Sequence, residues 1–306
     1  MGGKKMEFRQ LKSFITVVKF SSFTKAADHI GYAQSTITNQ IQSLEEEFNT
    51  LLFDRLGKQI KLTRDGEILY TYAVKILNLA DETKDRISSS QIPKGPLIIG
   101  TAESLCTHHL SKIFTILRSC YPDIEIDIRF DACSDYRASL RKNFVDIIYF
   151  LDVPCNEPDL VSHVLTDEPM TLIAPPNHPL AKKDQITPYD LHGQSLVLTQ
   201  NGCSYRRILE SMLAQAGAKP SSTLGITSNE VIKKLVSDGW GIGFLPYIAV
   251  KEELANHQFV ALPWAGSPFN IKVQLIYHKE KWISPAMKAF TDIILETFEI
   301  QADKIE

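Results

Sequence analysis

Residues 22–48 read SFTKAADHIGYAQSTITNQIQSLEEEF, and this stretch decides the fold of the N-terminal part of the chain. Ser22 is a favourable N-cap for a short helix, which the Gly31-Tyr32 turn ends. A longer helix is predicted from about Gln34 to Phe48. Its apolar residues recur at spacings of 4, 3 and 4 residues and form one inward face: Ile37, Ile41, Leu44 and Phe48.

The opposite face of the longer helix carries short, uncharged hydrogen-bonding side chains. Ser35, Thr38, Asn39 and Gln42 fall at i, i+3, i+4 and i+7, whereas the acids Glu45–Glu47 come only in the last turns. A solvated helix face is the alternative, but such faces are usually rich in Lys and Glu. A helix facing phosphates keeps its acids at the far end, so the pattern favours DNA reading. The DNA-contacting residues predicted in the two helices are Ser22, Thr24, Gln34, Ser35, Thr38 and Asn39.

The segments around this pair of helices complete a small basic module. Before it, Leu11, Phe14, Ile15 and Val18 predict a helix that ends near Phe20. After it, residues 52–55 and 59–62 flank Leu56-Gly57-Lys58, which indicates a hairpin or wing. Arg55 and Lys58 on the wing, and Arg64 just after it, are expected to contact phosphates.

A long helix is predicted from Arg64 to about Ser89, with Thr63 as its cap. Its apolar side chains follow the a/d pattern of a coiled coil. A single helix lying on a core is the alternative. The narrow seam, and the linker at 88–96 that follows, favour a dimerisation helix, and a two-fold dimer predicts an imperfectly palindromic operator. The predicted seam residues are Leu69, Tyr72, Ile76 and Leu79.

Charge and composition agree with a DNA-binding module joined to a second, larger part. The chain has 306 residues, of which 44% are hydrophobic and 23% charged, as in ordinary globular proteins. Residues 1–66 hold ten Lys or Arg against seven Asp or Glu, so they carry a net +3 within a total of −3. Five cysteines without C-x-x-C spacing argue against a disulfide scaffold or a zinc site. With no long apolar run and no secretory signal, we expect a cytoplasmic protein without cofactor or membrane partner.

The remaining two hundred residues alternate strand and helix patterns. Strands are predicted at 124–130, 146–150, 170–174 and 195–198, with helices near 136–142 and 205–216, which indicates an α/β fold with mainly parallel sheets. The glycine-rich run Gly239–Pro246 precedes an apolar segment and is predicted as a tight turn into a strand, not as a nucleotide loop. The adjacent pair His108-His109 cannot chelate one metal from a helix, so no metal site is predicted.

Two strand-to-helix junctions are candidate ligand sites. Asn201-Gly202-Cys203-Ser204 follows a strand and opens a helix, and Gly100–Ser104 is the equivalent junction earlier in the chain. Open α/β sheets bind ligands at this edge, and helix N-termini favour anions, which predicts a small carboxylate-bearing effector. The alternative is that Ser104 and Ser204 merely cap their helices. The predicted effector-binding residues are Thr101, Ser104, Asn201, Gly202, Cys203, Ser204 and Thr227.

The N-terminal sixty residues resemble one known family, the LysR-type transcriptional regulators. Two positions depart from its pattern, because Ala33 stands where a capping Ser is usual and Asn39 where Arg is frequent. The matching segments are Phe8-Arg9-Gln10-Leu11, Ser22-Phe23-Thr24-Lys25-Ala26-Ala27, Gln34-Ser35, Gln40-Ile41, Leu44-Glu45, Leu52-Phe53-Asp54-Arg55, Leu62-Thr63 and Gly66.

The resemblance implies a fold of class α plus α/β in three parts. These are a winged helix-turn-helix at 1–63, a linker helix at 64–90 and an effector-binding domain at 91–306. The last part would hold two Rossmann-like subdomains, similar to periplasmic binding proteins, at about 94–163 plus 268–306 and at about 164–267. The implied function is ligand-responsive regulation, without enzymatic activity, by a homodimer or homotetramer on double-stranded DNA. Two alternatives remain: a thiol-redox sensor that uses Cys203, and an α/β enzyme with an N-terminal assembly module.

Overall fold

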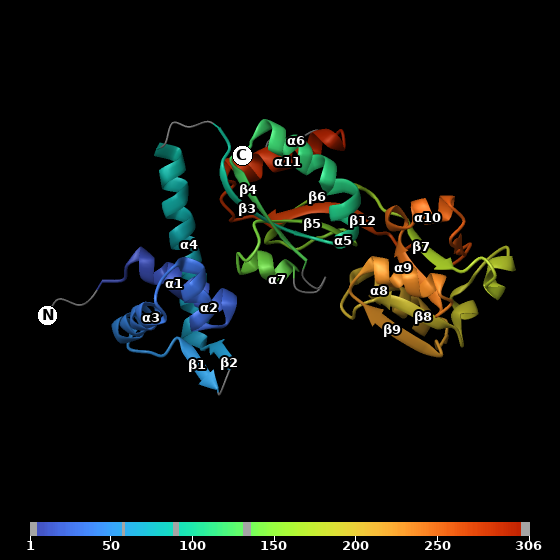
Figure 1. Cartoon of the computed structure of the whole chain (residues 1–306), viewed down its shortest axis with the longest axis horizontal. Coiled ribbons are helices and arrows are strands. Elements are labelled where there is room, and N and C mark those ends of the chain that lie inside the picture. Colours follow the sequence, from blue (N-terminus) through green and yellow to red (C-terminus); the bar gives the residue numbers. More distant parts are fainter. Residues whose placement is uncertain (1–4, 57–58, 88–91, 131–135, 301–306) are drawn as a thin grey trace. The chain divides into compact units, whose positions relative to one another are not determined.

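The computed structural model describes residues 5–56, 59–87, 92–130 and 136–300, and of residues 55, 56, 59 and 85–87 it describes the backbone only. The chain forms two compact units (Figure 1). The first comprises residues 1–91 and 142–144, and the second comprises residues 92–141 and 145–306. Within the described residues, no helix is both long and apolar enough to cross a membrane.

The first unit is a three-helix core followed by a hairpin and a long helix. Its elements are α1 (Phe8–Phe20), α2 (Phe23–Ile30), α3 (Gln34–Phe48), β1 (Phe53–Leu56), β2 (Gln59–Leu62) and α4 (Arg64–Ile87). The predicted inward face of α3 is confirmed, since Ile37, Ile41 and Leu44 are fully buried against α1 and α2. Phe48 is the exception, because it is 44% exposed at the end of the helix.

Local signals in the sequence fix the ends of these elements. The hydroxyl of Ser22 accepts a hydrogen bond from the backbone N–H of Lys25, so the predicted N-cap of α2 is confirmed. The hydroxyl of Thr63 accepts from the N–H of Gly66 and caps α4. A Cβ atom on Gly66 would lie 2.1 Å from the carbonyl oxygen of Leu52, so only glycine permits this close approach. The wing is an antiparallel hairpin in which Phe53 pairs with Leu62.

The second unit contains two five-stranded sheets. The first has the order β4-β3-β5-β12-β6 and the second the order β11-β7-β10-β8-β9. The strands are β3 (Gly95–Thr101), β4 (Ile124–Arg129), β5 (Ile147–Asp152), β6 (Leu160–Asp167), β7 (Met170–Ala174), β8 (Ser195–Thr199), β9 (Ser222–Ile226), β10 (Ile242–Pro246), β11 (Val260–Ala261) and β12 (Lys272–His278). We expected mainly parallel sheets, and this was wrong. The strand β12 is antiparallel to β5 and β6, and β7 is antiparallel to β10 and β11, because the chain crosses between the sheets twice.

Helices cover both faces of each sheet (Figure 1). The first sheet carries α6 (Ser111–Cys120) and α11 (Pro285–Thr297) on one face and α7 (Tyr136–Arg141) on the other. The second carries α8 (Ser204–Gln215) and α9 (Asn229–Ser237) on opposite faces. The remaining helical segments are α5 (Glu103–Leu105), the π-helical turn η1 (Cys106–Leu110), α10 (Lys251–Ala255) and the 3-10 turns η2 (Pro179–Lys182), η3 (Pro188–Leu191) and η4 (Tyr247–Ala249).

Each sheet marks one subdomain, and two crossover segments join them. The first crossover follows β6, which continues to Asp167, so the sheet extends four residues beyond the boundary expected at 163. The second crossover precedes β12. The two run side by side, because the N–H of Glu168 donates to the carbonyl of Ile271 at 3.0 Å. The glycine-rich run leads into β10, and the turn predicted there is confirmed: Gly239 has φ +81°.

Candidate functional site

The exposed face of α3 is polar along its N-terminal half. Gln34, Ser35, Asn39 and Gln42 are exposed, on the face opposite the buried isoleucines. The N-cap position is Ala33, whose side chain makes no capping hydrogen bond. The first backbone N–H groups of a helix lack partners within it and attract anions. This end of α3 therefore combines exposed side-chain amides with a partial positive charge.

Four of the predicted contact residues already make side-chain hydrogen bonds within the unit. The hydroxyl of Thr24 donates to Oε1 of Gln34 at 3.1 Å, which ties the start of α3 to α2. The hydroxyl of Thr38 donates to the backbone carbonyl of Gln34 at 3.0 Å, so its proton is not available to a base. Ser22 caps α2 as described above. The side chains best placed for bases are thus Ser35 and Asn39, together with the amide NH2 group of Gln34, whose Oε1 already accepts from Thr24.

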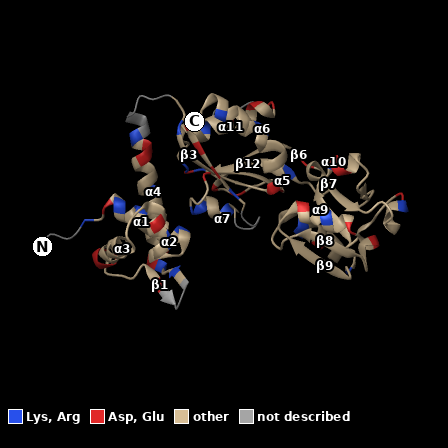
Figure 2. Cartoon of the chain, viewed as in Figure 1, with Lys and Arg blue, Asp and Glu red and all other residues tan. Residues whose placement is uncertain are grey.

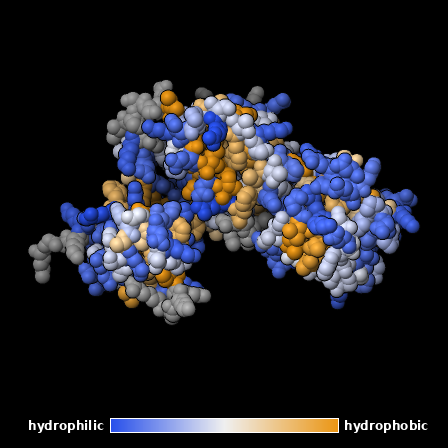
Figure 3. All heavy atoms as spheres, viewed as in Figure 1, coloured by the Kyte–Doolittle hydropathy of each residue, from blue (hydrophilic) through white to orange (hydrophobic). Residues whose placement is uncertain are grey.

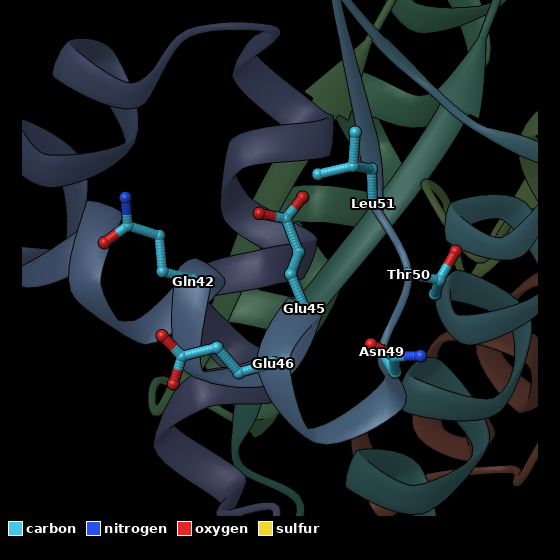
Figure 4. A pocket seen from close by; sticks show the side chains of 6 residues that line it. All are labelled: Gln42, Glu45, Glu46, Asn49, Thr50 and Leu51. Carbon is cyan, nitrogen blue, oxygen red and sulfur yellow. The ribbon is translucent and has the colours of Figure 1, made fainter.

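The acids of α3 gather at its C-terminal end (Figure 2). A hollow of about 510 Å³ lies there, and Figure 4 shows its lining residues, Gln42, Glu45, Glu46, Asn49, Thr50 and Leu51. The carboxylate of Glu45 accepts from the N–H of Leu52 at 2.9 Å and so fixes the connection from α3 to the wing. The negative charge has a structural use here, and it lies away from the phosphate-attracting end of the helix.

The cations predicted to contact phosphates lie on the wing and beside it. Arg55 is in β1, where only its backbone is described, and Lys58 lies outside the described residues. Arg64 is exposed at the first position of α4, and Lys61 is exposed on β2.

The predicted dimerisation seam divides into a buried and an exposed part. Leu69 is only 9% exposed and belongs to the core of its own unit, so its side chain cannot serve a seam between two helices as we expected. Tyr72 and Leu79 are 61% and 63% exposed, and Ile76 is half-buried. An apolar groove of about 700 Å³ runs beside them, lined by Met6, Phe48, Asn49, Thr50, Leu52, Asp65, Ile68, Leu69, Tyr72 and Ile76.

In the second unit, the carboxyl ends of two central strands carry matching threonines. Thr101 is the last residue of β3 and Thr199 the last residue of β8. Both are buried, and neither hydroxyl has a hydrogen-bond partner among the described residues. Buried hydroxyls normally have a hydrogen-bond partner. Two buried hydroxyls without a described partner, at the sheet edges where α/β proteins bind ligands, therefore mark a candidate site. Thr101 was predicted, but Thr199 was not. Its position as the counterpart of Thr101 in the second sheet was the signal that could have revealed it.

The serines at the two junctions are both buried, and Ser204 is hydrogen-bonded within the protein. Ser204 is 3% exposed, and its hydroxyl donates to the carbonyl of Leu151 at 3.0 Å, so the expectation of a free hydroxyl there was wrong. Ser104 is 4% exposed. Cys203 is the N-cap residue of α8 and is 2% exposed, so its thiol is not accessible as a redox sensor would require. Asn201 and Thr227 are exposed, and Gly202 is half-buried with φ +94°.

Carboxylates of the first subdomain lie at the N-termini of α8 and α9 in the second. The carboxylate of Glu103 accepts from the backbone N–H of Asn229 at 2.9 Å and from the hydroxyl of Ser228 at 3.4 Å. Asp152 is 5% exposed, lies next to Ser204, and accepts from Arg137 at 2.6 Å. Burial raises the pKa of Asp152 above its ordinary value, although Arg137 favours its charged form.

The histidine pair of the sequence lies in the π-helical turn after α5. Nδ1 of His109 is 2.9 Å from the hydroxyl of Tyr149, and burial, with the positive charges of His108, Lys251 and Lys112, lowers the pKa of His109 to about 4. Within the described part of the chain, no group of three or more His, Cys, Asp or Glu residues could hold a metal ion.

Comparison with known proteins divides the chain as the geometry does. Residues 8–67 match the family described as "Bacterial regulatory helix-turn-helix protein, lysR family", and residues 90–299 match "LysR substrate binding domain". An uncharacterized HTH-type transcriptional regulator, YwqM of Bacillus subtilis, is 37% identical over 96% of this chain and 100% of its own length.

Solved structures share the fold over nearly the whole chain. A full-length OxyR variant from Pseudomonas aeruginosa is 24% identical with a TM-score of 0.74, and 95% of each chain is covered. Full-length CbnR in complex with its target DNA is 20% identical with a TM-score of 0.60, over 95% of this chain and 100% of that one. At these identities the likeness shows the fold alone.

Proposed function

Because this chain belongs to the LysR family of bacterial transcriptional regulators, we propose that α3 reads an operator in the major groove through Gln34, Ser35 and Asn39. The observation that carries this proposal is the exposed, uncharged and polar N-terminal half of α3. Side-chain amides such as those of Gln34 and Asn39 form paired hydrogen bonds with adenine. The neutral face also avoids repulsion between carboxylates and phosphates.

The cations of the wing and of α4 hold the DNA backbone in this proposal. Arg55, Lys58 and Arg64 contact phosphates, which position the protein without reading sequence. Two copies of the chain associate through the exposed apolar face of α4, with Ile68, Tyr72 and Leu79 at its centre. A two-fold dimer presents two copies of α3 to successive major grooves, and its operator is an imperfect palindrome.

The second unit binds a small effector between its two subdomains, at Thr101 and Thr199. A ligand that hydrogen-bonds these hydroxyls would satisfy two buried polar groups that have no other partner among the described residues. The effector class that we propose is a small carboxylate, because helix N-termini open at this edge. Glu103 and Asp152 limit that class, since an anionic ligand has to compete with carboxylates of the chain itself.

The experiment that tests DNA binding measures the affinity of the purified chain for duplex DNA at several salt concentrations. We expect the logarithm of the affinity to fall linearly with the logarithm of the salt concentration. Replacing Arg55 and Lys58 by Ala should flatten this slope by about one unit per lost phosphate contact. Lys84→Ala is the matched control, because Lys84 is exposed on α4 and pairs with Asp81. A chain without measurable affinity for DNA would refute the proposal.

The effector site has its own test, a thermal-shift screen of the full chain against small carboxylates. A ligand at about 100 times its Kd stabilises its unit by about 2.7 kcal/mol. Thr101→Val should weaken the response, because the variant keeps the shape of the side chain but loses the hydroxyl. An equal response in the native chain and in the variant would exclude Thr101 from the site.

A further inference from the structure

The contact between Glu103 and α9 joins the two subdomains. Glu103 lies just after β3 in the first subdomain, and α9 belongs to the second. One carboxylate oxygen accepts from the N–H of Asn229, the first residue of α9, at 2.9 Å, and the other accepts from the hydroxyl of Ser228 at 3.4 Å. The side chain of Ser228, although at the N-cap position, does not itself cap the helix. The cap of α9 is therefore supplied by the opposite subdomain.

We propose that Glu103 is an internal ligand of the effector cleft, which occupies the anion site at the N-terminus of α9 and latches the two subdomains together until an effector carboxylate displaces it. This inference rests on the proposed effector function. It makes Glu103 a residue that determines specificity, because only ligands that compete with a carboxylate can open the latch.

Two further observations support a ligand site at this position. The hydroxyl of Thr101, two residues before Glu103, is fully buried without a partner among the described residues, although a group there would normally be paired. Asn229, which donates to the carboxylate, is 8% exposed, so this charge-assisted hydrogen bond is partly shielded from water, which strengthens it.

The second carboxylate in the cleft differs from Glu103 in a way that separates their roles. Asp152 is 5% exposed and is neutralised by Arg137 at 2.6 Å within its own subdomain. The neighbouring bond from Ser204 to the carbonyl of Leu151 also links the subdomains and is buried. Asp152 is thus paired without help from the second subdomain, and the hydroxyl of Ser204 is bonded to a backbone carbonyl. The hydrogen bonds described for the Glu103 carboxylate go to Ser228 and Asn229 at the start of α9, so the carboxylate can exchange them for those of a ligand.

The test is hydrogen exchange of the full chain, read at the backbone amide of Asn229, without DNA and without effector. Glu103→Ala should speed the exchange of this amide by about ten-fold or more, because a charge-assisted hydrogen bond is lost. Sodium acetate should then slow the exchange again, since its carboxylate can fill the place of the missing side chain. Acetamide, and sodium chloride at the same ionic strength, should not.

Two variants serve as controls. Glu230→Ala removes an exposed carboxylate from the same end of α9. This carboxylate pairs with Lys233 within the helix, so its loss should leave exchange at Asn229 nearly unchanged. Glu103→Gln keeps one acceptor and the side-chain volume, so it should speed exchange less than Glu103→Ala and show no rescue by acetate.

Unchanged exchange in Glu103→Ala would overturn the latch, and so would faster exchange that acetate fails to reverse. Because neither DNA nor effector is present, these outcomes do not depend on whether the proposed function is right.

Discussion

The face of α3 that we propose to read DNA and the subdomain junction that we propose to bind an effector are both polar, but their side chains are bonded differently. On α3, Ser35 and Asn39 are exposed on a regular helix, opposite a fully buried apolar face. In the cleft, Ser204 and Glu103 are bonded across the two subdomains. The first surface is exposed as it stands, so it needs no rearrangement to meet the DNA that we propose as its ligand. The second is partly occupied by the protein's own groups, and in our proposal a ligand replaces one of them, the carboxylate of Glu103.

This difference shows what each region needs in order to act. A preformed face gains affinity directly from each contact, and its response to mutation should be local. A cleft held by internal bonds responds only to ligands whose affinity differs between the bound and the released arrangement. The first region therefore suits recognition of sequence, and the second suits regulation.

The largest effect on DNA affinity is expected from loss of the dimer, because each dimer presents two copies of α3 to the operator. Replacing Tyr72 and Leu79 by Glu puts like charges on the exposed apolar face of α4 and should give a monomer at micromolar concentration. Because two linked binding events are lost, affinity for a palindromic operator should fall by about 100-fold or more. Sedimentation equilibrium and DNA titration measure the two effects. Thr71→Glu, an exposed position on the same helix, is the control. A double variant that stayed dimeric would refute the interface.

An intermediate effect is expected in the cleft, where two kinds of hydroxyl should behave in opposite ways. Thr101→Val and Thr199→Val remove buried hydroxyls without a described partner, so each should stabilise the effector-free protein by about 1 kcal/mol. Ser204→Ala removes the bond to Leu151 and should destabilise it by about 1 kcal/mol. Urea unfolding measures both changes.

The control for these variants is Thr223→Val, at an exposed position on β9, which should change the free energy of unfolding by less than about 0.5 kcal/mol. If Thr101→Val were as destabilising as Ser204→Ala, the hydroxyl of Thr101 would have a partner in the effector-free protein. The proposed difference between the two hydroxyls would then be wrong.

The smallest effect concerns His109. Its pKa is lowered to about 4 in the folded chain, so it stays neutral while the unfolded chain takes up a proton near the ordinary value of 6.5. Its contribution to stability is therefore complete above pH 6.5 and is lost progressively as the pH falls toward 4. The melting temperature should drop less between pH 7 and pH 5 in His109→Gln than in the native chain. His257→Asn, at an exposed position, is the control and should lose as much melting temperature as the native chain. An identical fall in melting temperature in all three proteins would contradict the role assigned to His109.

Helical periodicity predicted the first unit well because it depends on local spacing. The stripe of Ile37, Ile41 and Leu44 defined both the core face and the exposed face of α3, and Ser22 marked the start of α2. Leu69 shows the limit of the same reasoning. A 3-4 repeat on α4 cannot tell whether its residues face another helix or the core of their own unit, and Leu69 faces the core.

The cleft was less predictable because its contacts join residues far apart in the chain. The sequence marked the junctions at Thr101 and Ser204 as strand-to-helix turns, and the structure has both turns. The partners of Ser204 and Glu103 lie 53 and 126 residues away, and no local pattern specifies them. The return of the chain to the first sheet through β12, which makes that sheet mixed, is equally nonlocal.

The central claim is that the exposed face of α3 reads bases, and selection of binding sites from random duplex DNA tests it most directly. The native chain should enrich a motif of two related half-sites. Asn39→Ala should enrich the same motif with the preference lost at one base position in each half-site, at a cost of about 1–3 kcal/mol there, and with the others retained. Identical motifs from the native chain and Asn39→Ala, with equal preference at every position, would contradict the claim.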